Sequence, residues 1–183
     1  MPEGSPTLSA LGVVPRDVYP VGRLDADSEG LLLLTNDREV AHRLAHPSFA
    51  HPKTYLVQVE RIPDRQALER LRRGGILLRG FRSLPAEVRL LPQEPSLSPR
   101  DVPIRFRKHV PTAWLELTVR EGKNRLVRRL TAAVGHPTLR LVRVGLGPLR
   151  GDDLAPGQWR RLSRGEVRLL RRSLKLPQSP SSG

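Results

Sequence analysis

Six segments of the chain have the apolar patterns typical of β-strands. In residues 53–60 and 113–119, apolar and polar positions alternate, which predicts strands with one buried face. In the first of these, Tyr55 and Val57 share a face with Lys53. The other predicted strands are residues 76–78, 86–91, 139–146 and 159–162.

Four further segments place apolar residues three or four positions apart, as on one face of an α-helix. Their ends carry typical capping residues. Asn36 or Asp37 can cap the first helix, Gly135 follows the third, and Ser163 with Glu166 has the spacing of a capping box for the fourth. The predicted helices are residues 37–45, 63–73, 123–134 and 163–174.

Single helices interleaved with strands predict an α+β fold, with a mixed, mostly antiparallel sheet and helices packed on it. A chain of 183 residues can bury the core of one domain, which we place at residues 1–174. Residues 175–183 are rich in Pro and Ser and predict a disordered tail. Residues 1–15 predict an irregular lead-in, and residues 92–103 a mobile loop.

Charge is the main functional indication outside the motifs. The chain has 32 Lys and Arg against 18 Asp and Glu, a formal net charge of +14. This excess favours a polyanionic partner, with nucleic acid as the first choice. Aromatic residues make up only 4% of the chain, so we do not expect rows of stacking aromatics to carry RNA binding.

The composition gives little support for metal binding or for a membrane span. The chain has no cysteine, which excludes disulfides and thiolate metal sites. His42, His46 and His51 lie close in sequence but lack the spacing and carboxylates of a metal site, so we interpret them as surface or capping histidines. No apolar run approaches the roughly 20 residues of a membrane span, and no signal-peptide pattern is present. We therefore predict a cytoplasmic protein with no metal and no membrane partner.

The most informative stretch is GRLDADSEGLLLLTND, residues 22–37. If its beginning is extended, Arg23 and Asp25 leave the same face of the chain. The apolar block Leu31–Leu34, bounded by glycine and polar residues, predicts a short buried strand or the edge of the core. A charged turn attached to a rigid apolar segment suits a catalytic carboxylate.

Other interpretations of Asp25 must be weighed against a catalytic one. An aspartate in a glycine-flanked turn is often an ordinary turn or cap residue. The D-x-D-x-E-G spacing also resembles the start of a calcium loop, but the twelfth position, which should be Glu, is Asn36. A hydrolytic pair of Asp25 with Asp27 stays open, because two residues' spacing fixes no separation in space. From the residues alone, Asp25 is a candidate.

Residues 22–36 resemble the G-R-L-D-x-x-S-E-G-L-L-L-L-T-N signature of the ribosomal RNA pseudouridine synthases of the RsuA type. Two later blocks are similar to the same family, in the same order. Residues 53–55 (KTY) match its K-x-Y strand, and residues 121–129 (EGKNRLVRR) match its E-G-[KR]-N-R-x-V-R-R segment. The resemblance spans residues 4–163, and residues 103–114 are closest to the E branch of the family, which acts on 23S rRNA of the large subunit.

The resemblance implies a pseudouridine synthase catalytic fold whose central sheet carries a cleft. It implies isomerisation of one uridine of ribosomal RNA to pseudouridine, without a cofactor, by a protein that we expect to be a monomer. Family members usually carry an apolar strand and an N-K-P-x-G turn before the point where this chain starts, and many carry an S4 domain. A misassigned start, a replaced first strand and an absent first strand all stay open.

The resemblance also assigns roles to residues. It implies that Asp25 is the catalytic carboxylate, that Arg128 is its ion partner, and that Tyr55 stacks on the target base. From the pattern alone, Arg128 is one more arginine on a basic helix and Tyr55 a core residue of a strand. The residues expected to contact RNA are Arg23, Lys53, Lys123, Asn124, Arg125 and Arg129.

Two functions of different classes follow. The first is an rRNA pseudouridine synthase. The second is a non-catalytic RNA-binding or ribosome-assembly module on the same fold, which would bind RNA in a salt-sensitive way without isomerising uridine. A carboxylate hydrolase built on Asp25 and Asp27 is remote, because it leaves Tyr55 and Arg128 without roles.

Overall fold

The computed structural model describes residues 15, 17–100, 104, 107, 109–151 and 153–178. The predicted lead-in lies almost entirely outside these residues. The described helices are α1 (Arg38–Ala45), η2 (Pro47–Phe49, a 3-10 helix), α2 (Arg65–Arg73), α3 (Leu126–Ala133) and α4 (Arg164–Ser173). The described strands are β1 (Tyr19–Pro20), β2 (Glu29–Gly30), β3 (Leu34–Thr35), β4 (Lys53–Glu60), β5 (Leu77–Leu78), β6 (Phe81–Arg82), β7 (Glu87–Leu90), β8 (Thr112–Val119), β9 (Thr138–Leu146) and β10 (Leu149–Arg150).

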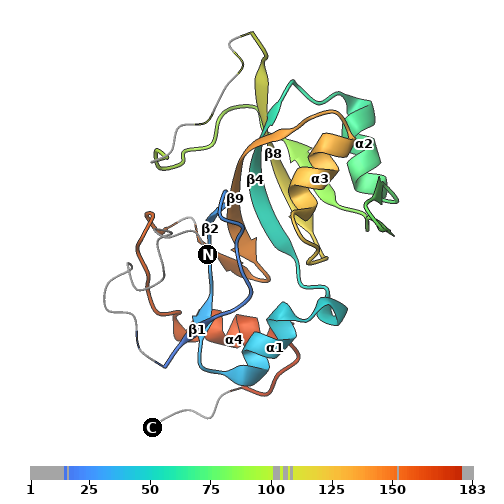
Figure 1. Ribbon diagram of the computed structural model, residues 1–183. Helices are drawn as coiled ribbons and strands as arrows, with labels where there is room; N and C mark the ends of the chain where they lie inside the picture. Colours follow the sequence, from blue (N-terminus) through green and yellow to red (C-terminus); the bar gives the residue numbers. More distant parts are fainter. Residues whose placement is uncertain are drawn as a thin grey trace.

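The long strand β4 lies at the centre of the main sheet, between β8 and β9 (Figure 1). The strand order is β10-β9-β4-β8-β7 with antiparallel neighbours, and β2 adds a short parallel pairing to β9. Tyr55 of β4 stands opposite Leu117 on one side and Arg143 on the other. The predicted α+β class and the mixed, mostly antiparallel sheet are confirmed.

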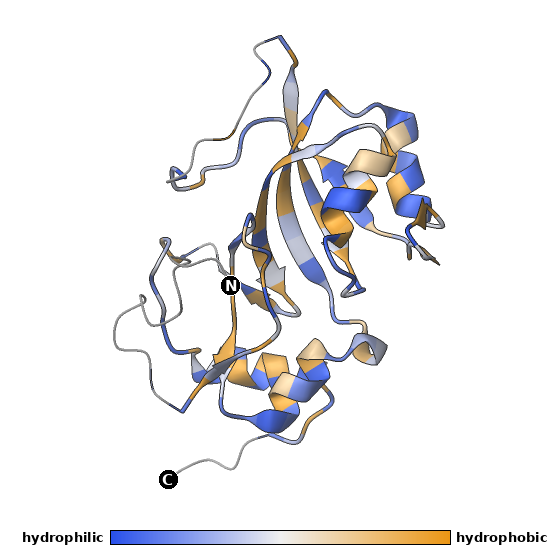
Figure 2. Ribbon diagram, viewed as in Figure 1, coloured by the Kyte–Doolittle hydropathy of each residue, from blue (hydrophilic) through white to orange (hydrophobic). Residues whose placement is uncertain are grey.

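The larger core lies between this sheet and the helices α2 and α3, which stand side by side next to it (Figure 1). Val57 and Val59 on β4 have no exposed surface, and Leu71 of α2 and Leu130 of α3 are buried against the same cluster. In Figure 2 both helices carry apolar and hydrophilic residues, as expected for helices with one buried face. Burial of these side chains is the main source of the sheet's stability.

A second, smaller core lies below the sheet, where α1 and α4 pack with Val21 and Leu33, the residues next to β1 and β3 (Figure 1). It joins Val40 and Leu44 of α1 to Leu170 of α4. Leu176 is also buried in it, with 5% of its surface exposed, although the sequence predicts a disordered tail from residue 175. The apolar side chain of Leu176 holds the first residues after α4 against this core; residues 179–183 lie outside the described part.

The segment between the two cores follows the prediction in part. Leu33 is buried and Leu34 begins the short strand β3, so the apolar block reaches the edge of the smaller core. Two helices begin at the predicted caps. At α1, the Asp37 carboxylate accepts hydrogen bonds from the backbone N–H groups of Glu39 and Val40, both at 3.0 Å. At the start of α4, the capping box of Ser163 and Glu166 is present.

Three details of the prediction are wrong. Helix α3 begins at Leu126 and not at Lys123, because Arg125 adopts the left-handed conformation (φ 50°, ψ 32°), which a helix cannot include. Residues 159–162 form no strand, since Arg160 pairs with Asp153 and Glu166 and holds this segment beside the start of α4. The hairpin of β5 and β6 includes a strand that the sequence did not reveal, because two-residue strands carry too little pattern.

Gly30 is the closest approach between the N-terminal segment and the sheet. Its φ is +109°, and a Cβ built there would overlap the backbone of Arg143 on β9. We expect Gly30→Ala to lower the free energy of unfolding by about 3 kcal/mol or more, because backbone strain adds to a clash that neither backbone can relieve. Chemical denaturation followed by circular dichroism measures this loss.

Gly157→Ala is the matched control. Gly157 also has positive φ, +77°, but a Cβ there meets nothing within 4 Å. We expect it to cost only about 1 kcal/mol, from the left-handed backbone alone. Equal losses in the two variants would show that close packing of β2 on β9 contributes little.

Candidate active site

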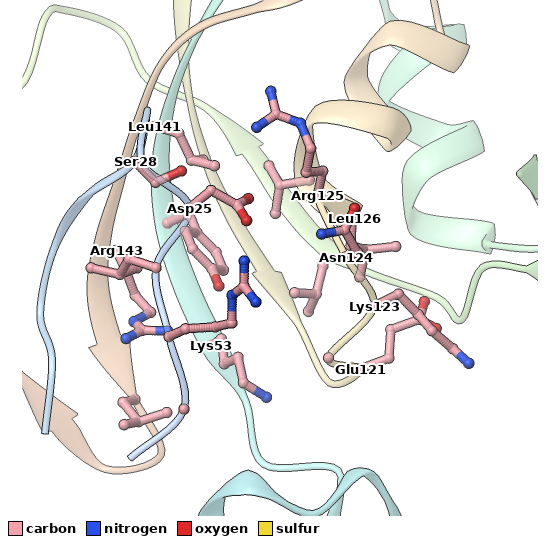
Figure 3. A pocket seen from close by; sticks show the side chains of 18 of the residues that line it. Asp25, Ser28, Lys53, Glu121, Lys123, Asn124, Arg125, Leu126, Leu141 and Arg143 are labelled. Atoms are coloured by element: carbon pink, nitrogen blue, oxygen red, sulfur yellow. The ribbon is translucent and has the colours of Figure 1, made fainter. Parts of the chain in front are cut away.

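A cavity of about 310 Å³ opens beside the sheet, in the size range of small-molecule sites, roughly 300–1,000 Å³. Its walls come from segments far apart in the sequence. They are the turn at residues 21–28, the end of α1, the first half of β4, the loop and helix start at residues 121–127, and β9. Figure 3 shows this space with charged side chains on both sides.

Asp25 projects into the cavity from the turn that precedes β2. The turn is closed by a hydrogen bond of 2.9 Å from the Ser28 N–H to the Asp25 carbonyl. In Figure 3 the Asp25 carboxylate is directed into the space between the strands that carry Arg143 and Lys53 and the loop that carries Asn124. The carboxylate is half-buried, so it is both fixed and accessible to a ligand.

The next carboxylate, Asp27, is held by two arginines of the opposite wall. Arg125 donates two hydrogen bonds to it, of 2.9 and 2.8 Å. Arg128 donates one of 2.6 Å to its backbone carbonyl and forms an ion pair with its carboxylate, with 3.3 Å between Nε and Oδ2. The hydrogen bonds from Arg125 hold the pKa of Asp27 below its ordinary 3.8.

This arrangement corrects the predicted role of Arg128. The sequence resemblance implies a direct ion pair with Asp25, whereas the Arg128 guanidinium contacts Asp27, two residues further on. Arg128 thus fixes the position of the turn, and it is also close enough to Asp25 to interact with it electrostatically without a direct ion pair. The pairing of Asp27 with arginines also leaves no free carboxylate pair, which removes the hydrolase interpretation.

Glu29, the third acidic residue of the motif, is also tied to arginine. Arg140 of β9 donates hydrogen bonds of 3.0 and 2.9 Å to its two carboxylate oxygens, and Arg100 lies 3.4 Å from it. Of the three carboxylates in the D-x-D-x-E motif, Asp27 and Glu29 therefore anchor the turn to the rest of the fold. Asp25 is the one that lines the cavity.

Arg143 is a site residue that sequence reasoning missed. It lies on β9, only 4% exposed, and its Nε donates a hydrogen bond of 2.8 Å to the Leu31 carbonyl. Its Nη2 is buried and has no partner at standard hydrogen-bond geometry, although the Tyr55 hydroxyl is close enough to Arg143 for a hydrogen bond to lower the Tyr55 pKa. A buried arginine that faces a cavity with an unsatisfied donor is costly, and such groups mark functional sites. The available signal was an arginine in the middle of an apolar strand.

Tyr55 and Lys53 bring a phenol and an ammonium to the same wall. Burial raises the pKa of the Tyr55 hydroxyl, and the neighbouring Arg143 guanidinium offsets part of that rise. Burial also lowers the pKa of Lys53, and Arg143 adds to that effect. Asp25 is close enough to Tyr55 to act on its hydroxyl electrostatically. The two side chains lie on the same face of β4, as their spacing predicts.

The structure brings most of the predicted RNA-contact residues to one place. Arg23, Lys53, Lys123, Asn124 and Arg125 line the cavity. Arg129 is not part of its lining and donates a hydrogen bond of 3.3 Å to Asn124 instead. The cavity therefore combines the Asp25 carboxylate with a cationic rim, while the second carboxylate in its lining, Glu121, accepts a hydrogen bond of 2.9 Å from the Leu84 N–H.

Within the described residues, no group of three or more His, Cys, Asp or Glu side chains lies together in a way that could hold a metal ion. None of the described helices has the length and apolar character needed to cross a membrane.

Comparison with known proteins agrees with this geometry. A model of the RNA pseudouridylate synthase family matches residues 5–133. The chain is 58% identical over 150 residues to the ribosomal large subunit pseudouridine synthase E of Xanthomonas axonopodis pv. citri, covering 82% of this chain and 78% of the relative. It is 50% identical over 161 residues to the enzyme of the same name from Vibrio vulnificus, covering 88% and 68%. A crystal structure of a pseudouridylate synthase superposes with a TM-score of 0.72 at 29% identity, over 90% of this chain and 65% of that one.

The contacts of Arg125 and Arg128 with Asp27 should make an acid-sensitive contribution to the free energy of unfolding. Because the folded-state pKa of Asp27 is depressed, its stabilisation is complete above the unfolded-state pKa and is lost as the pH falls through the folded-state value. We expect Asp27→Asn to lower the free energy of unfolding at pH 7 by less than about 1 kcal/mol, since the carboxylate is 44% exposed. Thermal denaturation from pH 7 to about pH 2 should show the two proteins converging. A constant gap would show that Asp27 acts through packing and not charge.

Proposed function

The chain belongs to the RNA pseudouridylate synthase family, and we propose that it converts one uridine of large-subunit (23S) ribosomal RNA to pseudouridine in the Asp25 cavity. The observation that carries this proposal is the single open carboxylate on a clamped turn, with Tyr55 and Arg143 in the same wall. The names of the relatives from Xanthomonas and Vibrio support a large-subunit rRNA substrate.

The reaction is an isomerisation. The glycosidic bond from the ribose C1′ to the base N1 breaks, the base turns, and C1′ bonds to C5 of the same base. A proton leaves C5 and N1 gains one, so no atom is added and nothing is oxidised or reduced. Asp25 is placed to act as a carboxylate at the ribose or at the base, as nucleophile or as base.

Tyr55 and Arg143 support that carboxylate in different ways. The Tyr55 ring offers an apolar face for the target base, and its raised pKa keeps the hydroxyl protonated and able to donate a hydrogen bond at neutral pH. The unsatisfied Nη2 of Arg143 can donate to the Asp25 carboxylate or to the bound uridine. We propose that Arg143 serves as a cationic partner beside Tyr55, in addition to Arg125 and Arg128, whose charges act on Asp25 from the opposite wall.

The cationic rim fits the substrate's backbone. A uridine reaches Asp25 only when it leaves its stack, which costs a few kcal/mol. Phosphate contacts from Arg23, Lys53 and Lys123 can offset this cost, and Arg125 lies beside them in the cavity wall. The two arginines that hold Asp27 keep the turn in place while the RNA is bound.

We expect Asp25→Asn to abolish pseudouridine formation, at least about a 1,000-fold loss in kcat, while RNA affinity changes less than about threefold. Mapping of pseudouridine in a 23S rRNA transcript measures turnover, and fluorescence anisotropy measures binding. Asp153→Asn is the control, since Asp153 is an exposed carboxylate that pairs with Arg160 away from the cavity. RNA binding by the unaltered protein without any turnover would support a non-catalytic RNA-binding module instead.

Arg143→Met tests the proposed cationic partner. We expect kcat to fall about 100-fold, as for removal of one preorganised donor, with a smaller change in KM. Arg143→Lys keeps the charge and should recover part of the rate. Because Arg143 also anchors Leu31, the melting temperature of each variant is measured beside its rate. A variant with the native melting temperature and native kcat would remove Arg143 from the mechanism.

A further inference from the structure

Four rings gather at the lower end of β4, beside the cavity. This ring cluster consists of four side chains: His42 in α1, His46 directly after α1, Phe49 in η2, and His51 just before β4. His42 and His46 lie 5.3 Å apart between centroids, and Phe49 lies 6.0 Å from each of them in an edge arrangement. Phe49 and His51 are nearly parallel, at 17° and 6.2 Å. The sequence shows only scattered histidines and one phenylalanine here.

The turn that presents Phe49 is well braced. Pro47 starts η2, the Nδ1 of His46 accepts a hydrogen bond from the Ser48 N–H at 3.3 Å, and Ala50 closes the turn in the left-handed conformation at φ 47°. Backbone hydrogen bonds from Phe49 to His46 and from Ala50 to Pro47 measure 3.2 and 3.1 Å. A ring on such a turn is presented with little loss of conformational freedom when it binds.

Phe49 is nevertheless exposed, at 40% of its surface. Single exposed apolar side chains are common on protein surfaces, so the exposure of Phe49 is informative only together with the three other rings around it. The Arg43 guanidinium lies over one face of the same ring, 5.7 Å from its centre, so a base would stack on the part of the ring that Arg43 leaves open.

His51 supplies an independent sign of a ligand. It is only 9% exposed, and its Nε2 has no hydrogen-bond partner in the structure. Burial lowers its pKa, as does the nearby Lys53, so its ring is neutral at pH 7. The parallel pair of His51 and Phe49 thus forms a short uncharged stack that begins inside the protein and ends at its surface.

The ring cluster lies next to the cavity in the fold, although none of its four rings lines the cavity. The link between them is Lys53, which lines the cavity and whose ammonium donates a hydrogen bond of 3.5 Å to the His51 carbonyl. Leu44 and Ala45, close to His46 in sequence, also line the cavity wall. The rings therefore lie on the Lys53 side of the cavity.

We propose that the ring cluster is a stacking site for one unpaired base next to the target uridine, so that the enzyme holds single-stranded RNA outside the cavity. This inference rests on the proposed function, since it extends the same cleft. An RNA base fits better than an apolar peptide, because aromatic faces accept any base and the cleft beside them is cationic. The net charge of +14 supports the same partner.

Removal of the exposed ring tests the proposal. The probe is a short fluorescent single-stranded RNA with one uridine, bound to the Asp25→Asn protein so that no turnover intervenes. We expect Phe49→Ala to weaken Kd roughly 5- to 100-fold, the usual effect of one base–aromatic stack. Phe49→Tyr keeps the ring and should bind normally, whereas Phe49→Leu keeps apolar bulk without the ring and should not. Melting temperatures show whether each variant is folded.

Probes with a single abasic nucleotide locate the contact. With Phe49 present, loss of one base near the uridine should weaken binding as much as Phe49→Ala does. With Phe49→Ala, the same loss should have no further effect, because the base and the ring form one contact. Trp159→Ala is the matched control, since Trp159 is similarly exposed at 38% and is not part of the ring cluster.

The outcomes separate this inference from the proposed function. Native affinity in Phe49→Ala, an equal loss in Trp159→Ala, or abasic effects that persist without Phe49 would each overturn the stacking site. Equal weakening on fully duplex RNA would also overturn it, since paired bases offer no free face at a flank. Pseudouridine formation by the unaltered protein on a 23S rRNA transcript is scored separately, and its absence would overturn only the proposed function.

Discussion

The site depends on one close backbone contact, where the N-terminal segment lies against the middle of β9. Leu31 and Arg143 exchange hydrogen bonds: the Leu31 N–H donates to the Arg143 carbonyl at 2.7 Å, and the Arg143 Nε donates to the Leu31 carbonyl at 2.8 Å. Only a glycine at position 30 allows the chains to come this close. This contact places the turn of Asp25 beside the sheet. It also fixes the Arg143 side chain, which lines the cavity.

The acidic residues of the turn differ in whether they pair with arginine. Asp27 and Glu29 are neutralised by arginines from α3 and β9, and each pair ties the turn to a different part of the fold. Charge pairs of this kind contribute little net stability when exposed, so their main effect is geometric. Asp25 lies between these anchors and the cavity, which is the position that a carboxylate needs to meet a substrate while its own backbone stays still.

The high positive charge of the chain has two uses in this arrangement. Arg125 and Arg128 hold the turn through Asp27, while Arg23, Lys53 and Lys123 line the cavity, where we propose that they meet an anionic ligand. The ring cluster, as a proposed stacking site, would add aromatic faces beside the cationic cleft, which suits an RNA strand that offers phosphates on one side and bases on the other.

The amino-acid sequence by itself determined the four α-helices and the longer strands, the α+β class, and the choice of the Asp25 turn as the candidate site. These depend on local properties: alternation along β4, capping at Asp37 and Ser163, and a motif of adjacent residues. Tertiary structure alone decided that Arg128 pairs with Asp27, that Arg143 faces the cavity, and that Leu176 is buried. These depend on which strand lies beside which, and a guanidinium on a long side chain can reach several carboxylates within a few ångströms, so spacing along the chain cannot select its partner.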